Sequence, residues 1–432
     1  MNRRGIVESF SEEIIFKELK NGLKVSLVPK KDYYNTFGIF TTNYGSMDNQ
    51  FVPIGGGEEI QVPDGIAHFL EHKLFESEVG DAMDDFSKIG GNANAFTTSE
   101  KTAYLFEATM DIEENVLLLL DFVQHPYFEE KSVEREKGII AQEIQMYQDD
   151  PDWRLYFGLL QNLFPKEAIA IDIAGTVESI QEITPQDLSL CYETFYHPSN
   201  MNLTVVGNFD AEELLEKIEA NQDALDFLPK SEIQRKPMDI TGDVVRENTV
   251  EMEVEAPKFS FGQKLAVEMP VEIEKRTRFK LCMSAFTDLL FSSSSSHFES
   301  AYLSGVIDDT FSSGVSFERN AVVFSASGDS REPEEAIRLV REAYLNFERS
   351  PEFTEEKLES VKKRMLGKFL RSMNSLEFIA INVSSDAFEG TNFLHLPRLI
   401  DTLTLEEVLQ TAKGFVDEKR CSTFRIQPKG VD

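Results

Sequence analysis

The stretch Gly65–His72 (GIAHFLEH) constrains the fold of this chain more than any other. Within it, His68 and His72 stand four residues apart, and Glu71 directly precedes the second histidine. An α-helix has 3.6 residues per turn, so positions i, i+3 and i+4 lie on one face. The spacing therefore predicts a helix over 65–76 that presents two imidazoles and a carboxylate together. Apolar neighbours would pack this helix against a core: Ile66, Phe69, Leu70 and Leu74.

The order H-x-x-E-H inverts the commoner H-E-x-x-H and is typical of a zinc site with a general base. Catalytic zinc takes three protein ligands and leaves one position open. Glu136 and Glu143 are candidates for the third ligand, since seven residues make two helical turns and place them on one face. Apolar residues beside them point this face inward, where a carboxylate is costly unless paired, protonated or bound to metal. The alternative is a solvated acidic face shared with Glu129, Glu130 and Glu134.

The order of expected elements predicts a duplicated α+β fold. At 432 residues, two or more domains are expected. Both halves are expected to contain, in this order, strands, a helix, strands, several helices and a last strand. The residues themselves show no repetition between the halves. We predict two similar domains, each a mostly antiparallel sheet with helices packed on one side. Their expected bounds are 1–225 and 248–432, with a polar linker over 226–247.

Charge and cysteine usage exclude several partners. There are 76 acidic and 43 basic residues, giving a formal net charge of −33. Such a balance argues against binding to nucleic-acid phosphates or to an anionic membrane surface. No apolar run approaches the roughly 20 residues that span a bilayer, so no membrane insertion is expected. The three cysteines lack C-x-x-C spacing and fit a reducing compartment, which predicts a cytoplasmic location.

The segment His68–His72, followed some 70 residues later by Glu136 and Glu143, resembles the pitrilysin, insulysin and mitochondrial processing peptidase family. Three further stretches resemble its bacterial two-subunit branch: 143–151, 172–176 and 197–201. The resemblance implies that His68, His72 and Glu143 bind one Zn²⁺ ion and that Glu71 is the general base. Glu136 would support the site as a carboxylate behind the ligands. The two domains would form half of a clam-shell chamber.

Five residues match the family strand that pairs with an extended substrate: Asn92, Ala93, Asn94, Ala95 and Phe96. A peptide added to a sheet edge gains main-chain hydrogen bonds with little demand on side chains. An ordinary interior strand is the alternative interpretation. The serines at 292–296 lack a G-x-S-x-G elbow, so we expect a flexible loop there and no nucleophile.

The chain departs from the self-sufficient members of this family. Their second half carries an Arg and a Tyr that stabilise the oxyanion, whereas the corresponding region here, 297–309, has no convincing pair. By resemblance to the two-subunit members, we expect a related zinc-less subunit to supply it in a dimer. The predicted function is zinc-dependent endopeptidase cleavage of peptides inside the chamber. The alternatives are a non-catalytic interaction subunit and a peptide-binding module.

Overall fold

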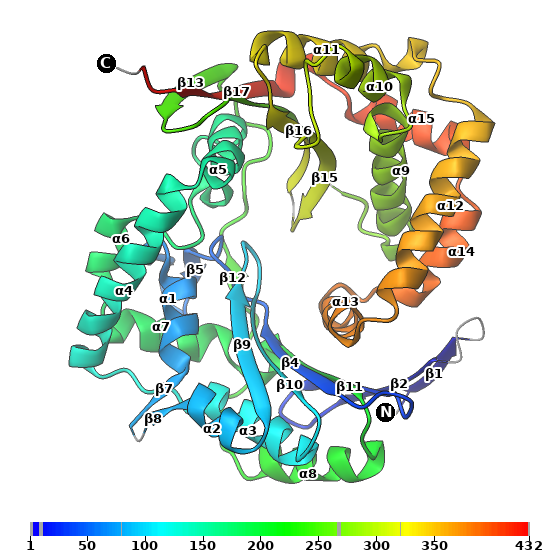
Figure 1. Ribbon diagram of the computed structural model, residues 1–432. Helices are drawn as coiled ribbons and strands as arrows, with labels where there is room; N and C mark the ends of the chain where they lie inside the picture. The colour runs from blue at the N-terminus through cyan, green and yellow to red at the C-terminus, as the bar shows by residue number, and fades with distance from the viewer. Residues whose placement is uncertain (1–2, 8–11, 79, 266–268, 320, 431–432) are drawn as a thin grey trace. The chain divides into compact units, whose positions relative to one another are not determined.

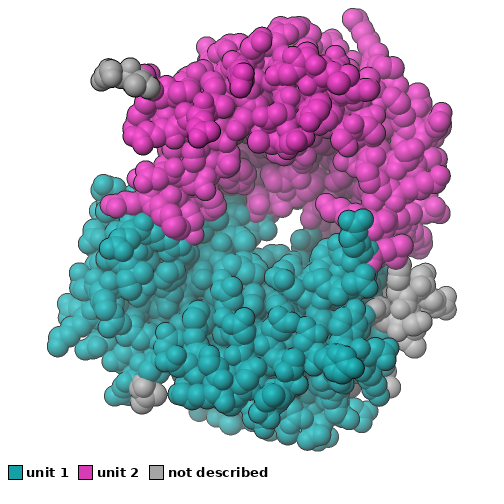
Figure 2. Space-filling view, in the orientation of Figure 1, with its two compact units in different colours: residues 1–144, 172–236, 371–394 teal, residues 145–171, 237–370, 395–432 magenta. Residues whose placement is uncertain are grey.

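The computed structural model describes residues 3–7, 12–78, 80–265, 269–319 and 321–430. The chain forms two compact units (Figure 2). Unit 1 contains residues 1–144, 172–236 and 371–394, and unit 2 contains 145–171, 237–370 and 395–432. The predicted domains 1–225 and 248–432 follow the two halves of the sequence and remain a prediction. The two units differ from the two halves of the sequence because each unit contains a helix that comes from the opposite half.

Unit 1 is built on a seven-stranded sheet with the order β1-β2-β3-β11-β4-β10-β9 (Figure 1). Strand β11 runs parallel to β3, and every other neighbouring pair in this sheet is antiparallel. The strands are β1 (Arg3–Val7), β2 (Glu12–Glu18), β3 (Lys24–Pro29), β4 (Thr36–Thr42), β9 (Gly91–Thr97), β10 (Thr102–Ala108) and β11 (Met201–Gly207).

Helices cover both faces of the central strands of this sheet. β4 is buried along its whole length. On one face, the Thr42 hydroxyl donates to the Phe195 carbonyl of α7 (Pro185–Phe195) at 2.6 Å. On the opposite face, Ser384 of α13 (Leu376–Glu389) donates to the Thr41 hydroxyl at 2.9 Å. Successive residues of a strand point to opposite faces, so this pair of contacts places α7 and α13 on opposite sides.

The remaining helices of the first half follow the apolar periodicity of the sequence. They are α1 (Ile66–Leu74), α2 (Ala82–Lys88), α3 (Ile112–Gln124), α4 (Glu130–Asp149), α5 (Pro151–Leu163), α6 (Val177–Glu182) and α8 (Ala211–Asp223). Short strands pair outside the main sheet: β5 (Gln50–Val52) with β6 (Ile60–Gln61) and with β12 (Gln234–Arg235), and β7 (Glu76–Ser77) with β8 (Gly80–Asp81).

Unit 2 contains a five-stranded sheet with the order β13-β17-β14-β16-β15. Its last strand, β17, lies between the first two and runs parallel to β13, as β11 does beside β3. The remaining pairs are antiparallel. This shared topology confirms the predicted α+β fold of two similar domains. The expectation of helices on one side is corrected for unit 1, because α13 covers the opposite face of its sheet. The strands are β13 (Glu247–Met252), β14 (Lys258–Lys264), β15 (Ser312–Glu318), β16 (Ala321–Asp329) and β17 (Cys421–Pro428).

An aromatic and aliphatic core fills the space between this sheet and its helices. Phe261, Phe324 and Tyr344 meet there, the last two with stacked rings 4.2 Å apart. The helices of the second half are α9 (Ile273–Phe291), α10 (Ser296–Leu303), α11 (Pro333–Leu345), α12 (Glu355–Ser372), α13, α14 (Leu396–Asp401) and α15 (Leu405–Phe415). No helix among the described residues is both long enough and apolar enough to cross a membrane.

Helix α5 packs on β14 and β17 at a glycine. A Cβ built on Gly158 would lie 2.3 Å from the ring of Phe424. Because real Cβ contacts are not this short, we predict that Gly158→Ala destabilises the protein by about 1–3 kcal/mol through overpacking. The urea midpoint of unfolding measures this change.

Gly367 of α12 is the matched control, since a Cβ there would meet no atom within 4 Å. Gly367→Ala should stabilise the helix by about 0.5–1 kcal/mol. Equal shifts of the two midpoints in the same direction would contradict the packing assigned to α5.

Candidate metal centre and active site

Two glycines let the start of α1 approach a neighbouring segment. Gly65 has a φ of 88°, and a Cβ there would lie 2.3 Å from the Ala174 carbonyl oxygen. Gly175 has a φ of 76° and would meet the Asp64 carbonyl in the same way. The segment 172–176, which the resemblance picked out, thus supports the helix that carries the histidines.

Helices α1 and α4 bring together the residues singled out by spacing. His68 Nε2 lies 3.6 Å from Glu143 Oε1, and His72 Nε2 lies 3.4 Å from Glu143 Oε2. The two imidazole rings are 4.6 Å apart between centroids. His68 is only 8% exposed. A solvated acidic face, the alternative considered for Glu143, does not describe this arrangement, because the carboxylate faces two imidazoles.

The donor set fits a divalent metal ion. One ligand atom from each of His68, His72 and Glu143 lies within 4.8 Å of the other two. Ligands about 2.0–2.2 Å from a tetrahedral zinc ion lie about 3.3–3.6 Å from one another. The two distances between an imidazole and the carboxylate, 3.6 and 3.4 Å, fall in this range. Two imidazole nitrogens and one carboxylate oxygen also form a typical catalytic zinc set.

Glu136 orients one of the imidazoles. His72 Nδ1 lies 2.9 Å from Glu136 Oε1. A carboxylate oxygen accepts, so Nδ1 carries the proton and the lone pair of Nε2 points toward Glu143. His68 differs, because its Nδ1 is buried without a hydrogen-bond partner among the described residues. The family resemblance implies that Glu136 supports a metal ligand, and its contact with His72 is compatible with that role.

Burial and neighbouring charges set the protonation of the metal-free site. Burial, together with the nearby His72, lowers the pKa of His68 to about 4. A neutral imidazole is the form that binds metal. Burial alone would lower the pKa of His72, but the hydrogen bond with Glu136 and the surrounding carboxylates raise it overall.

Thr97 contacts Glu71 and was not identified from the sequence. Its hydroxyl donates to Glu71 Oε2 at 2.5 Å, from the last residue of β9. Burial raises the pKa of Glu71, and the bond from Thr97 opposes that change. Thr97 lies 26 residues from Glu71, so no spacing rule signals the contact. One carboxylate oxygen is thereby held in place, while the other is left for a different partner.

A cavity of about 680 Å³ adjoins Glu71 and His72. Its wall includes Asn94 and Ala95 of β9, and the exposed Ile139 of α4. β9 is the last strand of its sheet and pairs only with β10 among the described strands. The alternative of an interior strand is therefore wrong. Asn92, Ala93 and Phe96 lie on the same edge strand, and the substrate-binding role of all five residues remains a prediction.

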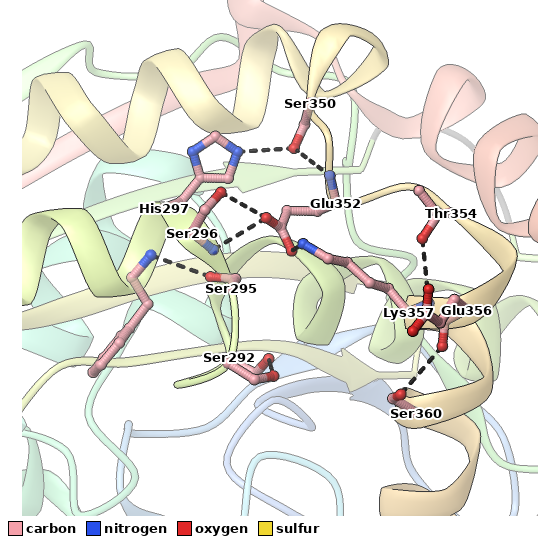
Figure 3. A network of polar contacts seen from close by, with 12 residues as sticks. Ser292, Ser295, Ser296, His297, Ser350, Glu352, Thr354, Glu356, Lys357 and Ser360 are labelled. Atoms are coloured by element: carbon pink, nitrogen blue, oxygen red, sulfur yellow. Dashed lines mark hydrogen bonds and ion pairs between the residues drawn. The ribbon is translucent and has the colours of Figure 1, made fainter.

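The serine run has a structural role in unit 2. Figure 3 shows Ser295, Ser296 and His297 at the start of α10. The Ser295 hydroxyl accepts from the Phe298 amide, and Ser296 donates to the buried Glu352 at 2.6 Å. The expectation of a flexible loop over 292–296 is corrected in part: N-capping by Ser295 starts a helix at Ser296.

The first half of the segment 297–309 belongs to α10, where Tyr302 is exposed and stacks on Phe298. A hydrogen bond to Asp309 raises the pKa of Tyr302. The sequence of this segment has no convincing Arg–Tyr pair. The consequence that we expect, a zinc-less partner subunit that supplies the pair, remains a prediction.

Comparisons with known proteins identify the family. Residues 51–177 match the family described as "Insulinase (Peptidase family M16)", and 182–365 match the family described as "Peptidase M16 inactive domain". "Uncharacterized zinc protease YmfH" of Bacillus subtilis (strain 168) is 42% identical over 98% of both chains. The chain therefore belongs to peptidase family M16, as its resemblance predicted.

Solved structures agree with this assignment. An M16-like peptidase from Alicyclobacillus acidocaldarius has a TM-score of 0.91 and 33% identity, covering 97% of this chain and 99% of the other. A protease from Helicobacter pylori, at 18% identity, shares the fold with a TM-score of 0.82 over 96% of this chain and all of the other. The first family match covers His68, Glu71, His72, Glu136 and Glu143.

The ligand geometry predicts that the purified chain holds about one zinc ion. His68→Ala and Glu143→Ala should each lose it, because two remaining ligands do not make a stable three-ligand site. Elemental analysis after dialysis against a zinc buffer measures the content.

His297→Ala is the control, since that imidazole bonds Ser350 in unit 2 at 2.8 Å. Its zinc content should equal that of the wild type. Retention of zinc by the His68 and Glu143 variants would place the ion elsewhere.

Proposed function

We propose that the chain is a zinc-dependent endopeptidase. The observation that supports this most is the convergence of one ligand atom each from His68, His72 and Glu143. The carboxylate of Glu71 lies on α1, the helix that also carries the two histidines. Membership of family M16 and the names of its relatives support the same chemistry. His68, His72 and Glu143 would hold a zinc ion, which when bound would supply a Lewis acid that lowers the pKa of water and polarises a carbonyl.

Glu71 takes the proton of the attacking water and passes it to the leaving amine. Its burial, at 8% exposed, favours this role because a carboxylate with a raised pKa accepts and releases protons more evenly near neutral pH. Thr97 fixes Oε2, so Oε1 is the oxygen left to handle the proton. Glu136 keeps the imidazole of His72 in the ligand-competent tautomer.

The edge of β9 binds the substrate backbone in this proposal. Asn94 and Ala95 of this strand line the cavity that also borders Glu71 and His72. A peptide paired with this edge is held mainly by main-chain bonds, so its sequence matters less than its extended form. We also propose that the two domains form half of a clam-shell chamber and that the protein is cytoplasmic. All three cysteines are free and buried, which is compatible with a reducing compartment.

Glu71→Gln tests the function. We expect the variant to bind zinc as the wild type does and to lose hydrolysis by about 10²–10⁴-fold, because an amide cannot take the proton. Digestion of a mixed peptide pool, read by mass spectrometry, measures cleavage. Zinc retained with cleavage unchanged would remove Glu71 from the mechanism. A wild type that binds peptides without cutting them, alone and with its partner, would favour the peptide-binding module.

The same assay tests the second subunit. Without preorganised oxyanion donors, the chain alone should work about 10²–10³-fold more slowly than with a related zinc-less chain. Cleavage rates are compared for the chain alone and for an equimolar mixture with a candidate partner. Full activity of the chain alone contradicts the need for a partner. A chain that binds zinc but is inactive in every mixture would instead be a non-catalytic interaction subunit.

A further inference from the structure

A fully buried lysine follows the second histidine. Lys73 on α1 has 0% exposure, and its Nζ lies 2.5 Å from Glu76 Oε2. Nζ also donates to the hydroxyl of Ser132 on α4. A buried ammonium is costly unless it is paired and hydrogen-bonded, so both partners must remain in place. The proposed mechanism gives Lys73 no role.

Two further bonds complete this polar group, here called the Lys73 cluster (Lys73, Glu76, Ser132 and Arg135). The Ser132 hydroxyl donates to Glu76 Oε2 at 2.5 Å, and Arg135 donates to Oε1 at 2.8 Å. Burial alone would raise the pKa of Glu76, but the bonds from Lys73, Ser132 and Arg135 hold it at about 2. The carboxylate therefore stays charged and joins the end of α1 to the first turns of α4.

The cluster lies next to the metal ligands along both helices. On α1, Lys73 directly follows His72. On α4, Ser132 precedes Glu136 by four residues, about 6 Å along the axis. Glu136 in turn bonds His72. The Lys73 cluster and the His72–Glu136 contact are thus two consecutive links between the same two helices, and Glu143 lies two turns further along α4.

We propose that the Lys73 cluster is a positioning element that holds α1 and α4 at the separation at which His68, His72 and Glu143 can share one metal ion. This proposal rests on the proposed zinc function. A metal ion that has to pull its ligands together binds more weakly than one that meets them already arranged. The cluster therefore acts on metal affinity, whereas a purely structural cluster would change only the stability of the fold.

Lys73→Met is the direct test, because it keeps an unbranched side chain as far as Cε and removes the buried charge. Glu76 is 26% exposed and keeps Arg135, so no unpaired buried charge is left. We expect the Kd for zinc, measured by competition with a chelator, to rise about tenfold. The visible spectrum of the cobalt(II)-loaded protein should also change, since it reports the arrangement of the ligands.

Lys362→Met is the matched control. Lys362 is also buried, at 8% exposure, and pairs with Glu359 on α12. This variant should leave the zinc Kd and the cobalt spectrum unchanged. Ser132→Ala removes two bonds of the cluster, one with Lys73 and one with Glu76, and should raise the zinc Kd by about 2–10-fold. In the double variant with Lys73→Met, the two effects should not add, because they act on one group.

The outcomes separate the two proposals. A wild-type chain that binds no zinc overturns both. Zinc binding by the wild type with an unchanged Kd and cobalt spectrum in Lys73→Met overturns the positioning role alone. If Lys73→Met does not fold, an unchanged Kd in Ser132→Ala has the same consequence.

Discussion

The site depends on the close approach of the Glu143 carboxylate on α4 to the two imidazoles on α1. Glu143 places one oxygen toward each of His68 and His72, at 3.6 and 3.4 Å. Those separations suit ligands around a tetrahedral ion, and burial keeps His68 in the neutral form that binds it. The glycines at the start of α1, the hydrogen bond of Glu136 and the contact of Thr97 all support this meeting. The proposed chemistry of Glu71 has no basis without it.

The order β3-β11-β4-β10-β9 in one sheet repeats as β13-β17-β14-β16-β15 in the other, and the last strand of each sheet runs parallel to β3 or to β13. Each sheet then receives a helix from the other half of the sequence: α13 packs on β4 and β11, and α5 packs on β14 and β17. β4 is consequently buried along its whole length, although it belongs to a mostly antiparallel sheet. The exchange explains why the compact units do not coincide with the halves of the sequence.

Much of the fold and of the candidate site could be predicted from the sequence, because local periodicity carries that information. The helix expected over 65–76 is α1, and the Glu136–Glu143 spacing did place both carboxylates on one face of α4. Apolar periodicity tells which face of α5 or α13 is buried, but not against which sheet. Thr97 and Ser132 were missed for a related reason, since their contacts with α1 join residues far apart in the chain. The start of α10 was missed because a serine run resembles a loop as much as a cap.

Anomalous diffraction at the zinc edge from crystals of the zinc-loaded chain tests the central claim most directly. The account predicts one strong peak bound by Nε2 of His68, Nε2 of His72 and the carboxylate of Glu143, at about 2.0–2.2 Å from each. A peak bound by other residues, or a zinc ion that leaves Glu143 uncoordinated, would contradict it.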